Sequence, residues 1–251
     1  MQTEYLATTE SEISPDIETA SSGYATRFDG KAGDFLLGVQ ARSVLDAVGG
    51  HLGSCVLDVG GGHGQLRSLY IEGGTQFTIH GSDSRCFERL PEPAAGETRV
   101  VGPLRGLPFT DSQFETVVSV RLLCHVPDWQ TVLTEMCRVS SDRVVFDFPT
   151  SRSINGLTPL LFGVKKQIES NTRTYENFRL DAFDAVLEQC GFRIDALHKQ
   201  FFFPMVVHRM LRGSPVSKWI EAVASVLGLR RIFGSPIVLT ARRIDGGSSD
   251  A

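Results

Sequence analysis

The chain has 251 residues, of which 41% are hydrophobic and 22% are charged, and its formal net charge is −4. This composition is typical of a globular protein with a buried core, and the negative charge argues against a general nucleic-acid-binding protein, which needs a basic face. No run reaches the roughly 18 consecutive apolar residues of a membrane-spanning helix. The acidic, polar start of the chain is unlike a signal peptide. We therefore expect a soluble, cytoplasmic protein.

The five cysteines are spread along the chain, and no two of them form a C-x-x-C pair. This spacing predicts neither a disulfide framework nor a zinc site, and it favours a reducing compartment. The histidines show no H-x-H or H-E-x-x-H spacing, so we expect no metal site.

The N-terminal part of the chain changes character after its first twenty residues. These carry five acids and no base, which predicts a disordered acidic tail over residues 1–20. From residue 24 to 48 apolar side chains recur near helical spacing. We expect a single domain over residues 21–244 and a disordered tail over 245–251.

Short apolar runs then alternate with helical patterns. Strands that are almost continuously apolar and alternate with helices indicate a parallel sheet with both faces covered, joined by right-handed crossovers. The predicted strands are 55–59, 76–83, 98–104, 114–123 and 142–149, and the predicted helices between them are 64–74 and 128–139.

The last third of the chain predicts an amphipathic helix over 179–192, a strand over 193–203 and a final strand over 235–244. Two insertions, at about 150–177 and 204–232, interrupt this order, and both are helical in rhythm and rich in basic residues. A basic, apolar lid suggests an apolar small molecule with some anionic character, or peripheral contact with a membrane surface. The alternative is that the basic residues only solvate the outer faces of the helices.

The segment "CVLDVGGGHGQL" (55–66) places four glycines within five positions directly after a buried strand. Ligands of parallel sheets bind outside the carboxyl ends of the strands, and residues without a Cβ let a ligand approach the backbone and the next helix N-terminus. We interpret the glycines as such a close-approach loop. The alternative is a tight strand-to-helix turn without a ligand.

The glycine spacing argues against two nucleotide-binding motifs. A G-x-G-x-x-G fingerprint would require glycine at Gln65 or at Arg67, and no Gly-Lys-Ser/Thr follows as in a Walker A loop. The spacing that is present is an acid followed by alternating glycines, Asp58-x-Gly60-x-Gly62-x-Gly64.

This pattern resembles motif I of the class I S-adenosylmethionine-dependent methyltransferases. Downstream, "LPF", "D-x-x-F-E-x-V" and "L-x-E-x-x-R-V" follow in the order found between the third and fifth strands of that superfamily. The resemblance covers about residues 24–149. It implies an α/β fold with a doubly wound, mostly parallel, seven-stranded Rossmann-like sheet and helical lid insertions, and S-adenosylmethionine as the cofactor.

The resemblance also implies a cofactor site around the glycine loop. Asp83, with Ser84 beside it, ends the second strand and would accept the ribose hydroxyls; alternatively, Asp83 caps the following helix. Leu104 would hold adenine through its backbone, because Pro103 stands where the family commonly has an aspartate.

The amino-acid end of the cofactor would lie near three further segments. Tyr24 and Arg27, in "YATRFDG", resemble an entry segment that closes over the cofactor, with Arg27 as the partner of its carboxylate. The alternative is a surface arginine. Arg121 follows the fourth strand, where the superfamily uses a backbone carbonyl near the cofactor's ammonium group. His63, inside the loop, would line the same end.

His125 is the candidate catalytic base, since it lies just past the fourth strand, where the methyl group would be presented. The alternative is a histidine that packs against the loop or bonds to its backbone. In the first insertion, Asn171, Arg173 and Tyr175 are the candidate substrate-binding residues.

The sequence thus predicts methyl transfer to a small, lipophilic or aromatic acceptor, with O- or C-methylation preferred. The alternative is a non-catalytic cofactor-binding protein with a regulatory or scaffold role, which the missing aspartate at Pro103 keeps open. An NAD-linked oxidoreductase is disfavoured by the failed dinucleotide fingerprint.

Overall fold

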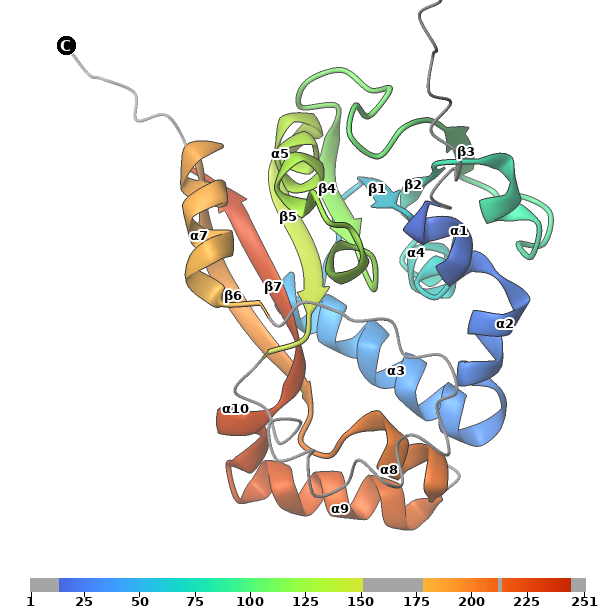
Figure 1. Cartoon of the computed structure of the whole chain (residues 1–251), viewed down its shortest axis with the longest axis vertical. Helices are drawn as coiled ribbons and strands as arrows, with labels where there is room; N and C mark the ends of the chain where they lie inside the picture. The colour runs from blue at the N-terminus through green and yellow to red at the C-terminus, as the bar shows by residue number, and fades with distance from the viewer. Residues whose placement is uncertain (1–13, 151–177, 212–213, 245–251) are drawn as a thin grey trace, which may run out of the picture.

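The structure, a computed structural model, describes residues 14–150, 178–211 and 214–244. Seven strands in this part of the chain form one sheet in the order β3-β2-β1-β4-β5-β7-β6 (Figure 1). Neighbours from β3 to β5 pair in parallel, and β7 runs antiparallel to both β5 and β6. The predicted seven-stranded, mostly parallel, doubly wound sheet is therefore confirmed. The strands are β1 (Cys55–Val59), β2 (Gln76–Gly81), β3 (Glu97–Val101), β4 (Phe114–Ser119), β5 (Ser140–Phe148), β6 (Phe192–Phe201) and β7 (Ser235–Arg243).

Helices cover both faces of the sheet (Figure 1). On one face, α5 (Trp129–Val139) and α7 (Leu180–Gln189) bury their apolar sides against the larger core cluster. On the other face, α3 (Gly30–Ala47) and α4 (Arg67–Glu72) pack on the second cluster. Because apolar layers lie on both sides, the central strands are buried almost without interruption. None of the helices in the described residues is both long and apolar enough to cross a membrane.

Helical structure begins earlier in the chain than the sequence predicts. Residues Pro15–Ala20 form the helix α1, so the prediction of a disordered tail is wrong for these six residues. The helix forms because Asp16 is buried against the end of β2 instead of being solvated with the other acids. Two short elements, α2 (Ser22–Ala25) and the 3₁₀ turn η1 (Thr26–Phe28), then lead into α3.

Several predicted elements are shorter in the structure, and three of them are shortened for a clear local reason. The helix predicted from residue 64 begins at Arg67, because the 3₁₀ turn η2 (Gly61–His63) precedes it. The strand predicted over 76–83 ends at Gly81, because Asp83 caps the 3₁₀ turn η3 (Ser84–Phe87). The strand predicted over 114–123 ends at Ser119, because the chain reverses at a left-handed residue before the turn η4 (Leu123–His125).

The second predicted insertion is helical, as expected, and forms α8 (Met205–Met210), α9 (Pro215–Val226) and α10 (Leu229–Phe233). We call these three the lid helices. They lie at one end of the molecule, below the sheet in Figure 1, and α8 packs against α3. The first insertion, from residue 151 to 177, falls outside the described residues.

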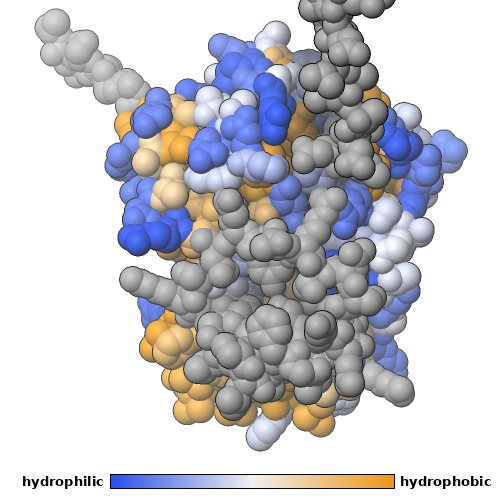
Figure 2. All heavy atoms as spheres, in the orientation of Figure 1, coloured by the Kyte–Doolittle hydropathy of each residue, from blue (hydrophilic) through white to orange (hydrophobic). Residues whose placement is uncertain are grey.

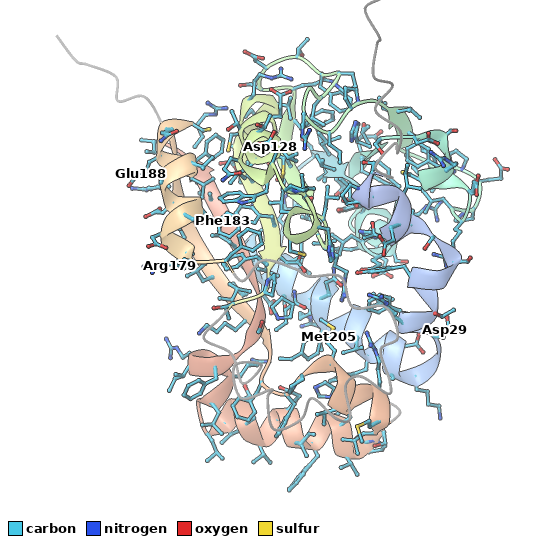
Figure 3. All side chains as sticks on the ribbon, in the orientation of Figure 1. Asp29, Asp128, Arg179, Phe183, Glu188 and Met205 are labelled. Carbon is cyan, nitrogen blue, oxygen red and sulfur yellow. The ribbon has the colours of Figure 1, made fainter. Side chains whose placement is uncertain are left out.

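Phe183 joins α7 to the sheet and to α5. Its ring centroid lies 4.6 Å from those of Trp129 and Phe148, 4.9 Å from Phe146 and 5.1 Å from Phe178. The side chain points inward from α7, whereas Glu188 on the same helix points away from the sheet (Figure 3). One fully buried ring thus connects three elements of the core.

Replacing this ring tests how much that connection contributes to stability. Phe183→Ala is expected to lower the free energy of unfolding by about 3–5 kcal/mol, because it leaves a cavity among four aromatic rings. Urea unfolding measures the change, with the exposed Glu188→Ala as the control in the same helix, expected within about 0.5 kcal/mol of the wild type. An equal loss of unfolding free energy in the two variants would show that the Phe183 ring does not stabilise the packing of α7.

Candidate functional site

The glycine loop lies at the carboxyl end of β1, between the ends of β2 and β4. Gly60 has a left-handed backbone, with φ of 70°, and a Cβ there would lie 2.6 Å from the Cδ2 atom of Leu122. A Cβ at Gly62 would lie 2.4 Å from the backbone oxygen of Cys86. The loop therefore needs glycine both for its conformation and for its close approach to the segments that follow β2 and β4.

His63 fastens this loop to the end of β4. Its Nδ1 atom accepts a hydrogen bond from the Gln65 backbone (3.1 Å), so its Nε2–H donates to the backbone oxygen of Val120 (3.2 Å). Burial lowers the pKa of His63 to about 4, which keeps the ring neutral and suited to this pair of bonds. The ring thus holds the loop in place through backbone contacts.

Asp58 lies beneath the loop and is buried. A Cβ at Gly61 would lie 2.3 Å from its Cγ atom, so the carboxyl group contacts the loop backbone directly. Burial raises the pKa of Asp58 to about 7, and the nearby Tyr70 hydroxyl opposes that increase. A cationic group brought close to Asp58 would favour its ionised form.

Helix α1 covers the loop from the outside (Figure 1). The Asp16 carboxylate accepts hydrogen bonds from the backbone N–H and the hydroxyl of Ser82, both at 2.6 Å. Sequence reasoning missed Asp16. A usable signal was present, since Ser14 followed by Pro15, with Glu18 in the first turn, is typical of a helix start.

Asp83 and Ser84 lie just past the end of β2, which stops at Gly81 and so is two residues shorter than predicted. The Asp83 carboxylate accepts hydrogen bonds from the backbone N–H (2.9 Å), Nε (2.9 Å) and Nη2 (3.1 Å) of Arg85. These hydrogen bonds hold the pKa of Asp83 at about 2, so its carboxylate is ionised and partly exposed to solvent. Asp83 thus caps η3 and also presents a charged acceptor beside the glycine loop.

Arg121 is held by its backbone conformation and by contacts to three other residues. It has a left-handed backbone, with φ of 58°, and its N–H donates to the buried Asp147 carboxylate at 2.6 Å. Its guanidinium stacks 4.3 Å above the ring of Phe28, and Nε donates to Oε1 of Gln40 at 2.8 Å. Burial raises the pKa of Asp147, and the charge of Arg121 opposes that increase.

Two hydrogen-bond donors lie beside the contact between Arg121 and Gln40 and take no part in it. Nη2 of Arg121 and Nε2 of Gln40 are both buried and have no hydrogen-bond acceptor in the described part of the chain. Buried donors without acceptors are costly, and an ion with several oxygen acceptors, such as a carboxylate, would satisfy both. Sequence reasoning missed Gln40, which reads as an ordinary polar residue of α3.

Tyr24 and Arg27 extend the same layer. The guanidinium of Arg27 lies 4.8 Å from the ring centroid of Tyr24, and that ring lies 5.8 Å from the ring of Phe28. Two guanidinium groups and two rings therefore form one stack from the N-terminal segment to the end of β4. Met205 points from α8 toward this stack, with its sulfur 4.0 Å from Nη1 of Arg121 (Figure 3).

The structure describes some of the remaining predicted residues and not others. His125 is half-buried in η4, and Leu104 is buried in the larger core cluster. The candidate substrate-binding residues Asn171, Arg173 and Tyr175 lie outside the described residues. Among the residues that are described, no three His, Cys, Asp or Glu side chains are arranged to hold a metal ion.

Several solved structures share this fold. A chain of the complex between the Trm112 methyltransferase activator and a methyltransferase from Haloferax volcanii aligns with a TM-score of 0.59 and 17% identity, over 92% of this chain and 97% of that chain. Magnesium protoporphyrin IX methyltransferase from Synechocystis, with bound SAH, aligns with a TM-score of 0.57 and 15% identity, over 90% and 97%. The [4+2]-cyclase SpnF aligns with a TM-score of 0.53 and 16% identity, over 81% and 79%. At these identities the likeness shows a shared fold.

The sequence itself carries a family signature over the five strands of the sheet that pair in parallel and hold the glycine loop. The methyltransferase domain family model matches residues 57–145, from β1 to β5. No curated protein matches the sequence. Residues 57–145 are therefore a methyltransferase domain of the class I S-adenosylmethionine-dependent superfamily.

Proposed function

We propose that this protein transfers the methyl group of S-adenosylmethionine to a small, lipophilic or aromatic acceptor, at an oxygen or a carbon atom. The observation that carries the proposal is the convergence of three groups at one edge of the sheet. These are the glycine loop, the ionised Asp83, and the buried donor pair of Arg121 and Gln40. When bound, S-adenosylmethionine supplies a methyl carbon activated by a sulfonium. The protein's part is to align the acceptor with that carbon, to exclude water and to remove a proton from the acceptor.

In this proposal the nucleoside half of the cofactor lies between the ends of β1 and β2. Asp83 accepts hydrogen bonds from the ribose hydroxyls, with Ser84 beside it, once the exposed Arg85 side chain turns aside. Because Gly60, Gly62 and Gly64 have no side chains, the cofactor can come close to the loop backbone. Leu104 offers its backbone to adenine, because Pro103 has no acceptor in its side chain.

The amino-acid half lies near the end of β4. Its carboxylate is held by Nη2 of Arg121 and Nε2 of Gln40, which completes the hydrogen bonding of both groups. Its ammonium group faces the buried Asp58, whose carboxyl the positive charge would keep ionised. Tyr24 and Arg27 close over the bound molecule together with α1.

Proton removal from the acceptor is assigned to His125. A hydroxyl or an acidic carbon must lose a proton as it attacks, and His125 lies half-buried just past β4. Asn171, Arg173 and Tyr175 remain the proposed acceptor contacts. The acceptor's apolar body would pack between the sheet edge and the lid helices.

A second candidate function is cofactor binding without methyl transfer. It is favoured by Pro103, which removes the usual acidic contact to adenine, and by the cyclase among the proteins of the same fold. Fold alone does not fix the reaction.

Calorimetric titration tests the cofactor site. The wild type is expected to bind S-adenosylhomocysteine in the micromolar range and NAD not at all. Asp83→Asn is expected to weaken binding about 10- to 100-fold, because a hydrogen bond to a charged acceptor is lost. The matched control is Asp181→Asn, since Asp181 forms a similar pair with Arg179 far from the loop. Binding of NAD, or equal binding by both variants, would contradict the assignment.

Arg121→Met tests the carboxylate site. The variant is expected to weaken S-adenosylhomocysteine binding by more than about tenfold, because a charge-assisted hydrogen bond to the carboxylate is lost. Methylthioadenosine, which lacks the amino-acid end, should bind the wild type and the variant equally. A parallel loss for both compounds would mean that Arg121 only supports the fold.

His125→Asn tests the catalytic assignment. Transfer of a radioactive methyl group to a panel of apolar phenols and β-dicarbonyl compounds is expected to fall about 100- to 10,000-fold in kcat, because the general base is lost. Affinity for S-adenosylhomocysteine should not change, and His198→Asn on the outer strand β6 should retain activity. An unchanged kcat would make His125 a structural residue. If the wild-type protein binds the cofactor but transfers no methyl group to any acceptor of the panel, the second candidate function is supported.

A further inference from the structure

The lid helices carry most of the exposed apolar surface of the described residues. Thirteen large hydrophobic side chains are exposed in the described residues as a whole, and eight of them lie between Met210 and Phe233. Figure 2 shows the resulting hydrophobic area at the end of the molecule formed by α9 and α10. We call this surface the lid patch; its members are Met210, Val216, Trp219, Val223, Val226, Leu227, Ile232 and Phe233.

Helix α9 has its amphipathic faces reversed relative to an ordinary surface helix. The positions that it buries are Ser217, Glu221 and Ala224. Its outward positions include Trp219, which is 66% exposed, and Val226, which is 87% exposed. A surface helix of a globular protein normally turns its apolar stripe to the core. The outer stripe of α9 is therefore not explained by packing among the residues that the structure describes.

Buried hydrogen bonds fix this orientation. His208 of α8 bonds to the Ser217 hydroxyl through Nδ1, and its Nε2 atom lies 3.0 Å from Oε1 of Glu221. The Glu221 carboxylate also accepts from the backbone N–H groups of Phe202 (3.0 Å) and Phe203 (2.8 Å) at the end of β6. Turning α9 to bury its apolar stripe would break all four contacts, so the stripe stays outside.

The segment that carries the lid patch differs in charge from the whole protein. Residues 204–234 contain five Lys or Arg and one acid, Glu221, which is buried, whereas the whole chain has a formal net charge of −4. Lys218 and Arg231 are exposed on the same helices as the apolar residues. Because this end is basic and the whole chain is net acidic, a negatively charged surface would attract it selectively.

We propose that the lid patch docks on an anionic lipid bilayer. Trp219, Val223 and Val226 enter the headgroup region, and Lys218, Arg230 and Arg231 face the lipid phosphates. An apolar stripe flanked by basic residues, with a tryptophan at the boundary, is the pattern of a helix that lies in a membrane interface. Helix α9 lies lengthwise along its end of the molecule, so its stripe can meet a flat surface (Figure 1). This inference goes beyond the proposed function and does not depend on it.

Vesicle binding of the full chain tests the proposal without any cofactor or acceptor. The protein is expected to sediment with vesicles of phosphatidylcholine and phosphatidylglycerol, weakly with phosphatidylcholine alone, and less at high salt. The chain has two tryptophans, and Trp129 is buried, so a blue shift of the emission on binding would report Trp219. Trp219→Phe should still sediment but lose the shift.

Variants separate the two parts of the interaction. Val226→Glu is expected to abolish sedimentation, and Lys218→Glu with Arg231→Glu to lower the partition coefficient more than about tenfold, since each basic residue near the surface contributes roughly fivefold. The matched control is Ile71→Glu on α4, another exposed apolar helix position, which should bind like the wild type. Three results would overturn the proposal: no binding to either vesicle, equal binding by Val226→Glu, or a dimer in light scattering that Val226→Glu dissociates.

Discussion

The hydrogen bond from the Arg121 backbone to the buried Asp147 carboxylate is the contact on which the candidate site depends. A non-glycine residue in the left-handed region costs about 1–3 kcal/mol, and the hydrogen bond to the buried Asp147 carboxyl group on β5 compensates for it. The reversal ends β4 at Ser119 and leads directly into the turn that carries His125. The same backbone conformation directs the guanidinium across the sheet edge to Phe28 and Gln40. One hydrogen bond thus positions both the candidate base and the candidate carboxylate site.

The rest of the site is assembled around that edge from segments that are far apart in the sequence. Asp16 of α1 reaches Ser82 at the end of β2, and His63 of the glycine loop reaches Val120 at the end of β4. These contacts use neutral or buried groups bonded to backbone atoms, so changes at the protein surface do not perturb them. The site is therefore preorganised by the ends of three parallel strands, which is the general advantage of this type of sheet.

The sequence was sufficient to predict the sheet, because the signal for each strand is local: a short apolar run next to a helical pattern. It was also sufficient to place Asp58 and Asp83 at strand ends. It did not reveal Asp16 or Gln40, because an acid in an acidic run and a glutamine on a helix look solvated until tertiary contacts bury them. The end of β4 was missed for the same reason, since Val120 and Leu122 continue the apolar run while Asp147, from another strand, ends it. Asn171, Arg173 and Tyr175 remain predictions.

Helix α9 shows how one element can meet two requirements that do not conflict. Its inward face of Ser217, Glu221 and Ala224 determines whether the lid folds, and its outward face determines what the lid touches. Because different residues serve each requirement, natural variation can alter one while preserving the other. Relatives with the same fold could therefore acquire or lose an attachment surface by changing a few outward positions, while the inward polar positions, which hydropathy alone would assign to solvent, stay constant.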